Sequence, residues 1–133
     1  MSVLNCQIVT PEKTALDQKA DFVALPLFDG EIGIAPGRAP MIGRLGFGEM
    51  RIRTGDTVIR YYVDGGFVQV SGDVVSVLTN RAVPSQEVDG DAARKHLLQA
   101  LEQPIPTVEL EEQRDRAISQ ARAQIWVSRS QQS

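Results

Sequence analysis

The sequence predicts a mainly β fold with an α-helical appendage: an N-terminal β-sandwich over residues 1–84, followed by an antiparallel two-helix hairpin over residues 85–133. Apolar residues recur with a period near two up to about residue 83, and turn formers interrupt them every several residues. After residue 85 the period changes to 3.6. Short, regularly spaced strands are typical of a sandwich or barrel, in which two apolar faces cover each other.

The first predicted strand covers residues 3–9, where Leu4, Cys6 and Ile8 alternate with polar residues. This alternation is expected of a strand with one buried and one solvated face. Five further strands are predicted over residues 20–27, 48–54, 57–63, 66–70 and 73–79, with turns at Gly55–Asp56, Gly65–Gly66 and Gly72–Asp73.

The first predicted helix begins after Asp89, which is suited to cap its N-terminus, and Thr107 is suited to cap the second. The proline-rich segment at 104–106 is expected to form the turn between them. The apolar stripes comprise Ala93, Leu97, Ala100 and Leu101 in the first helix and Leu110, Ala117, Ile118, Ala121 and Ile125 in the second. Because alanine buries little area, we expect the hairpin to be marginally stable alone and able to move.

Composition excludes several classes of function. A formal charge of −3 and a pI near 5.1 disfavour nucleic acid as the main partner. No stretch approaches the ~18 apolar residues of a membrane-spanning helix, and the first residues lack the features of a signal peptide, so we expect a cytoplasmic chain without membrane insertion. Cys6 is the only cysteine and His96 the only histidine, so we predict neither a metal site nor a cofactor.

The stretch GEIGIAPGRAP, residues 30–40, is rich in glycine and proline. A phosphate-binding loop would need a lysine and an immediate helix, and the stretch has neither. Turns between sandwich strands account for its glycines and prolines. Small and apolar residues around Arg38 also suggest a flat docking surface, and Asp29 and Glu31 form an acidic turn beside it.

The end of the chain carries a local positive charge. Four arginines stand against a single acidic residue, Asp115, over residues 114–133. A solvated helix face is one explanation, and a surface for an acidic partner is the other. The arginines are Arg114, Arg116, Arg122 and Arg129.

Three stretches carry a resemblance to a known family: TPEK at 10–13, GEIGIAPGRAPMIGRLGFGEMRI at 30–52 and YYVDGGFVQVSGDVVSVLTNRAV at 61–83. With the helical hairpin, they resemble the epsilon subunit of bacterial and chloroplast F-type ATP synthases, whose mitochondrial counterpart is named delta. The resemblance implies a non-catalytic rotor subunit of the central stalk. Such a subunit links gamma to the c-ring, couples proton flow to ATP synthesis, and lies peripherally at the cytoplasmic face of the inner membrane.

The resemblance also implies roles for particular residues. In the family the hairpin can extend along gamma and inhibit ATP hydrolysis, and we expect the arginines of its second helix to contact the alpha and beta catalytic subunits in that state. The c-ring contact would comprise Asp29, Gly30 and Glu31, and the gamma contact Arg38, Ala39, Pro40 and Met41.

Two departures from the family pattern stand out. Arg38 replaces a common histidine, so its partner must be a carboxylate or a carbonyl. In some members the motif I-D-x-x-R-A binds ATP, and the matching residues 88–93 read VDGDAA. Ala92 replaces the arginine, Asp91 adds a negative charge, and Arg94 is rotated by ~200° around the helix. We therefore predict weak or absent ATP binding, with Asp89 a partial remnant of the motif.

Two other functions compete with the rotor subunit. An enzyme needs a positioned base or nucleophile, and His96 and Cys6 form no recognisable dyad. A small binding module, in which the sandwich holds a ligand and the hairpin regulates access, is the stronger rival. Only the family resemblance separates it from the rotor subunit.

Overall fold

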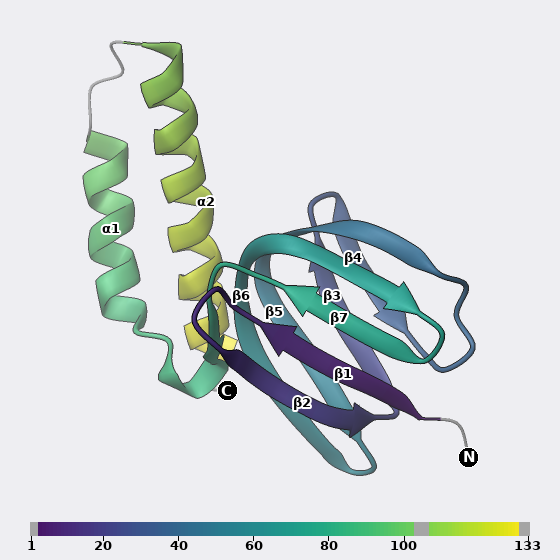
Figure 1. Ribbon diagram of the computed structural model, residues 1–133. Coiled ribbons are helices and arrows are strands. Elements are labelled where there is room, and N and C mark those ends of the chain that lie inside the picture. Colours follow the sequence, from purple (N-terminus) through teal and green to yellow (C-terminus); the bar gives the residue numbers. More distant parts are fainter. Residues whose placement is uncertain (1–2, 103–106, 131–133) are drawn as a thin grey trace. The chain divides into compact units, whose positions relative to one another are not determined.

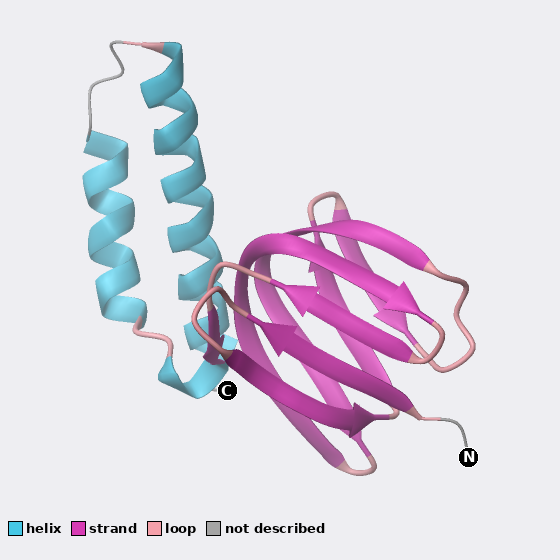
Figure 2. Cartoon of the chain, viewed as in Figure 1, coloured by secondary structure: helices cyan, strands magenta, loops and turns pink. Residues whose placement is uncertain are grey.

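The computed structural model describes residues 3–102 and 107–130. The chain divides into two compact units, Met1–Pro84 and Ser85–Ser133, the first built of strands and the second of helices (Figures 1 and 2). The predicted proline-rich turn at 104–106 lies outside the described residues. The strands are β1 Leu4–Val9, β2 Thr14–Ala20, β3 Phe22–Leu27, β4 Gly30–Ile34, β5 Met41–Thr54, β6 Thr57–Ser71, β7 Val74–Leu78 and β8 Ala82–Pro84.

These strands form one sheet in the order β2-β1-β7-β6-β5-β3-β4, with β8 paired to β6. The sheet folds over on itself, so that β1, β2 and β7 face β3 and β4 in Figure 1. The Thr54 hydroxyl donates to the Lys19 carbonyl at 3.0 Å, and the Gly55 N–H donates to the Asp21 carboxylate at 2.6 Å, which joins the end of β2 to the end of β5. The predicted β-sandwich is therefore confirmed.

The core of the sandwich lies between these layers and consists of the inward-facing side chains of both. Leu4, Cys6 and Ile8 of β1 are buried, as predicted. Met50 and Ile52 of β5 are buried too. The other core residues are Ala20, Val23, Leu25, Ile34, Leu45, Val63, Val68, Val70, Val75 and Val77.

The predicted turn at Gly65–Gly66 was wrong, because both residues lie inside the continuous strand β6. Gly66 has a φ of +105°, and a Cβ there would lie 1.9 Å from the carbonyl oxygen of Leu78 in β7. Glycine is therefore required by the close approach of the neighbouring strand, rather than by a chain reversal. The turns at Gly55–Asp56 and Gly72–Asp73 are confirmed as two-residue hairpin loops.

The helical unit comprises a short 3₁₀ turn (Ser85–Glu87), α1 (Gly90–Glu102) and α2 (Val108–Ser130). Both predicted caps are confirmed: the Ala92 N–H donates to Asp89 Oδ1 at 3.0 Å, and the Leu110 N–H donates to the Thr107 hydroxyl at 3.2 Å. No described helix combines the length and the apolar character needed to cross a bilayer.

Most residues of the two predicted apolar stripes are buried or half-buried. The prediction was wrong for two of them, which are exposed. Leu101 and Leu110 are each 43% exposed. They lie in the last turn of α1 and the first turn of α2, next to the connecting segment. Ala93, Ala100, Ile118, Ala121 and Ile125 are the buried members.

Candidate interaction surface

The acidic turn predicted from the sequence joins β3 to β4. Leu27 pairs with Gly30, so the chain reverses through two residues, Phe28 and Asp29. Gly30 has a φ of +144°, which only glycine adopts readily. Asp29 and Glu31 are both exposed, and the Glu31 carboxylate forms an ion pair with Arg51 of β5. The structure thus brings the three predicted residues together at one exposed hairpin end.

Phe28 connects this turn to β5. Its side chain is 71% exposed, and the Arg44 guanidinium lies 4.7 Å from the centre of its ring. The Phe28 N–H also donates to the Arg44 carbonyl at 2.8 Å. A cation–π contact at an exposed site contributes ~0.5–1 kcal/mol. Arg44 therefore helps to fix the position of the acidic turn.

The loop before β5 carries the second predicted group of residues. Arg38, Ala39 and Pro40 are exposed, and Met41, the first residue of β5, is half-buried. The Gly37 N–H donates to the Asp73 carboxylate at 3.2 Å, which ties the loop to the β6–β7 turn. These residues thus continue directly into β5.

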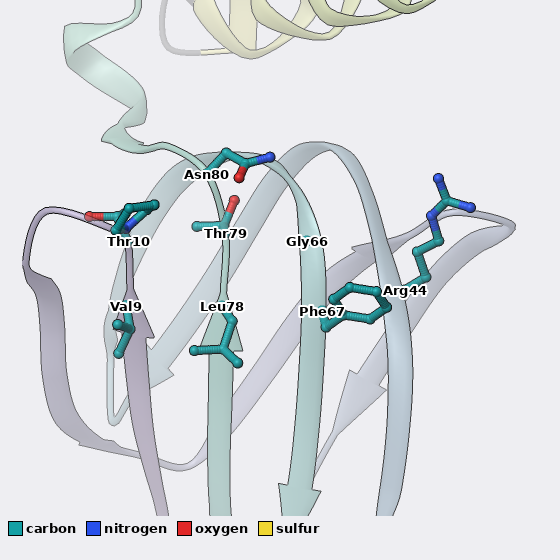
Figure 3. Close-up of a pocket in the computed structure, with 9 residues that line it drawn as sticks. Val9, Thr10, Arg44, Gly66, Phe67, Leu78, Thr79 and Asn80 are labelled. Atoms are coloured by element: carbon teal, nitrogen blue, oxygen red, sulfur yellow. The ribbon is translucent and has the colours of Figure 1, made fainter.

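An apolar groove on the outer face of the sandwich was not predicted. Val9, Leu78 and Phe67 lie side by side on β1, β7 and β6, as Figure 3 shows. Phe67 is 56% exposed and Leu78 is 50% exposed. The groove has a volume of about 720 Å³ and is also lined by Thr10, Pro11, Arg44, Gly66, Thr79 and Asn80. The missed signal was that apolar residues stand at the solvent-facing positions of these strands.

Cys6 is buried in the core, on the opposite side of β1 from its exposed face. Burial, with a smaller contribution from the negative charge of Asp17, raises the pKa of the thiol from 9.0 to about 12. A thiol is a nucleophile only as the thiolate, so Cys6 is a core residue at neutral pH.

A second cavity, of about 390 Å³, lies at the start of α1 and is lined by Asp89, Gly90, Asp91, Arg94 and Ser128 among others. The sequence spacing predicted that Arg94 would point elsewhere, but its long side chain reaches this cavity. There it forms an ion pair with Asp91 at 3.0 Å. One arginine beside two carboxylates gives this cavity no surplus positive charge for a phosphate.

The four arginines of α2 do not form one cluster. Arg122 and Arg129 are exposed. Arg114 reaches across to α1: its Nε donates to the Ala100 carbonyl at 2.8 Å, and its Nη2 donates to the Leu101 carbonyl at 3.4 Å. The sequence placed Arg114 on the second helix but gave no sign of this partner.

Comparison with known proteins agrees with this architecture. Residues 3–85 match the family model described as ATP synthase, Delta/Epsilon chain, beta-sandwich domain. The ATP synthase epsilon chain of Rhodopirellula baltica is 54% identical over 126 residues, which cover 95% of this chain and 98% of the relative. The sodium ion specific epsilon chain of Propionigenium modestum is 31% identical, covering 90% of this chain and 85% of the relative.

Solved structures show the same fold. A chain of the Euglena gracilis mitochondrial ATP synthase, solved as OSCP/F1/c-ring, gives a TM-score of 0.83 at 22% identity, with 92% of this chain and 79% of that chain covered. A chain of the central stalk/c-ring of the Tetrahymena thermophila mitochondrial ATP synthase gives 0.76 at 16% identity, with 94% and 96% covered. These matches confirm the resemblance and leave the binding-module hypothesis without support. The chain belongs to the ATP synthase delta/epsilon family, as an epsilon chain of that enzyme complex.

Proposed function

We propose that the chain is a non-catalytic central-stalk subunit that links gamma to the c-ring and thereby couples ion flow to ATP synthesis. It would act as a peripheral protein at the cytoplasmic face of the inner membrane. Its C-terminal hairpin would serve as an inhibitor of ATP hydrolysis. The observation that carries this proposal is the exposed apolar groove on the outer face of the sandwich.

The groove is suited to bind gamma. Aromatic and aliphatic side chains that meet on an exposed sheet face are typical of protein interfaces. On β5, the residue after Met41 is Ile42, which is 74% exposed. Arg44, two residues after Ile42, lines the groove. The gamma contact predicted at Arg38–Met41 therefore continues into the apolar face, and we assign both to gamma.

The acidic turn is suited to a different partner. Asp29 and Glu31 present carboxylates at an exposed hairpin end, where basic or polar loops of the c-ring would pair with them. Because Glu31 is already paired with Arg51, we expect Asp29 to contribute more of the charge offered to the c-ring. Arg44 contacts Phe28 and also lines the groove, so the two proposed contacts adjoin.

The hairpin of α1 and α2 is suited to inhibit ATP hydrolysis by moving, a role that we call the brake. Alanines make up much of its buried surface, so its two helices are held together weakly. We propose that the exposed Arg122 and Arg129 contact the alpha and beta subunits when the hairpin extends. Arg114 and Arg116 would join them only after leaving their partners in the folded form.

The gamma contact can be tested by binding. We expect the double substitution Phe67→Ser and Leu78→Ser to weaken binding of the full chain to purified gamma by at least thirtyfold, because truncating two central apolar contacts costs ~1–3 kcal/mol each. Val58→Ser is the control: Val58 is 45% exposed on β6 but lies outside the groove. Unchanged affinity of the double variant, measured by calorimetry, would contradict the assignment.

The brake can be tested by truncation. Removing the residues after Val88 leaves the whole sandwich unit in place. We expect the complex assembled with this truncated chain to remain coupled and to hydrolyse ATP faster than the complex with the full chain. An unchanged hydrolysis rate would argue against a brake.

A further inference from the structure

The C-terminus of α1 is capped by a side chain from α2. The last four carbonyls of a helix have no partner within it, and they carry the negative end of the helix dipole. The last turn of α1 contains no basic residue, and it ends at Glu102. Arg114 supplies the missing positive charge, because its guanidinium donates to the carbonyls of Ala100 and Leu101 at 2.8 and 3.4 Å.

Arg114 reaches α1 from the packed face of α2. It precedes Ile118 by four residues and Ala121 by seven, so all three share one side of the helix. Ile118 and Ala121 are buried, and the Arg114 side chain is only 21% exposed. A further contact, to the carboxylate of Asp115, is longer at 3.8 Å and involves a side chain that is 65% exposed. The bonds to α1 are therefore its main contacts.

We propose that Arg114 is the latch of the hairpin, which holds α1 against α2 and must release before the helices separate. α1 has 13 residues, close to the ~12–15 below which an isolated helix is marginal in water. Its buried residues, Ala93 and Ala100, contribute little apolar area. A charged cap therefore makes a large contribution to keeping α1 in place. The inference that Arg114 holds the two helices together rests on these contacts alone. Any consequence for ATP hydrolysis rests also on the proposed function.

Hydrogen exchange of the full isolated chain tests the latch. Because a helix as short as α1 is marginal in isolation, separation from α2 exposes its amides to exchange. We expect Arg114→Gln to speed exchange at Ala93–Leu101 about tenfold, as loss of a charge-assisted hydrogen bond predicts. Amides of β5 and β6 should not change. Arg122→Gln, which removes the same charge from an exposed position of α2, should alter exchange in α1 by less than twofold.

Arg114→Lys provides a second variant. Lysine keeps the charge but lacks the planar fork that reaches two carbonyls at once, so we expect an intermediate rate. Equal exchange in the Arg114→Gln and Arg122→Gln chains would overturn the latch.

ATP hydrolysis by the assembled complex tests the brake independently of the latch. We expect Arg114→Gln to lower ATP hydrolysis, because a released hairpin extends more readily. Faster exchange in α1 with unchanged hydrolysis would leave the latch standing and reject the brake. Unchanged exchange would reject the latch, whatever the hydrolysis rate.

Discussion

Replacing Gly66 with alanine should destabilise the sandwich far more than replacing a glycine in an open turn. The added Cβ would lie 1.9 Å from the Leu78 carbonyl oxygen and 2.9 Å from the Thr79 Cα. Both atoms belong to backbone, so no side-chain rotation relieves the overlap. β6 and β7 must therefore separate where Phe67 pairs with Leu78.

The magnitude follows from two costs. A φ of +105° lies outside the regions open to alanine, and such strain costs ~1–3 kcal/mol. Separating the strands weakens one or two ladder hydrogen bonds, at ~0.5–1.5 kcal/mol each. We expect a total loss of about 4 kcal/mol. Gly55→Ala is the control: its φ is +60° and nothing lies within 4 Å, so we expect a loss of ~1–2 kcal/mol.

Urea unfolding of both variants measures these losses. The amide signals of β1 and β7 should be followed by NMR, so that the helical unit does not contribute to the transition. Equal losses for Gly66→Ala and Gly55→Ala would show that the close approach of Leu78 does not constrain β6.

Two further predictions concern titration and nucleotide binding. The pKa of Cys6 rises from 9.0 to about 12 on folding. Below pH 9 the thiol is protonated in both the folded and the unfolded chain, so its titration does not affect stability. Between pH 9 and 12 only the unfolded chain loses the proton, so the free energy of unfolding should fall by ~1.4 kcal/mol per pH unit. Urea unfolding at pH 8 and 10 should show this slope reduced in Cys6→Ala; parallel curves would contradict it. Calorimetry of the full chain with ATP should show no micromolar affinity, because Arg94 is paired with Asp91; a micromolar dissociation constant would contradict this.

The sequence pattern predicted the central strands but missed β8, residues 41–47 of β5, and both edge strands, β2 and β4. These two strands stand at the two ends of the sheet order, so each pairs with a single neighbour within the sheet. Edge strands need less apolar sequence, and here they read TALDQKA and GEIGI. Their structure comes from pairing with a neighbour, which local propensity does not reveal.

The candidate interaction surfaces were predictable only in part. The acidic turn and the loop around Arg38 were singled out from their residue types, and the family resemblance added the partners expected for them. The structure shows that both are exposed. The groove was missed because an exposed Phe67 or Leu78 looks like ordinary strand composition until the register places them side by side. The bonds of Arg114 were missed because periodicity gives the face of a helix and not the atoms opposite it.

The long pairing of β5 with β6 has a mechanical consequence. Its register is constant from Met41 opposite Val70 to Thr54 opposite Thr57, with the pairing interrupted only at Gly46. A force that slides one strand along the other loads these rungs together, whereas a force that peels the strands apart loads them one after another. A load that enters near Met41 and slides β5 along β6 would therefore be shared along the whole ladder. The β5–β6 pairing would then be the last part of the sandwich to separate.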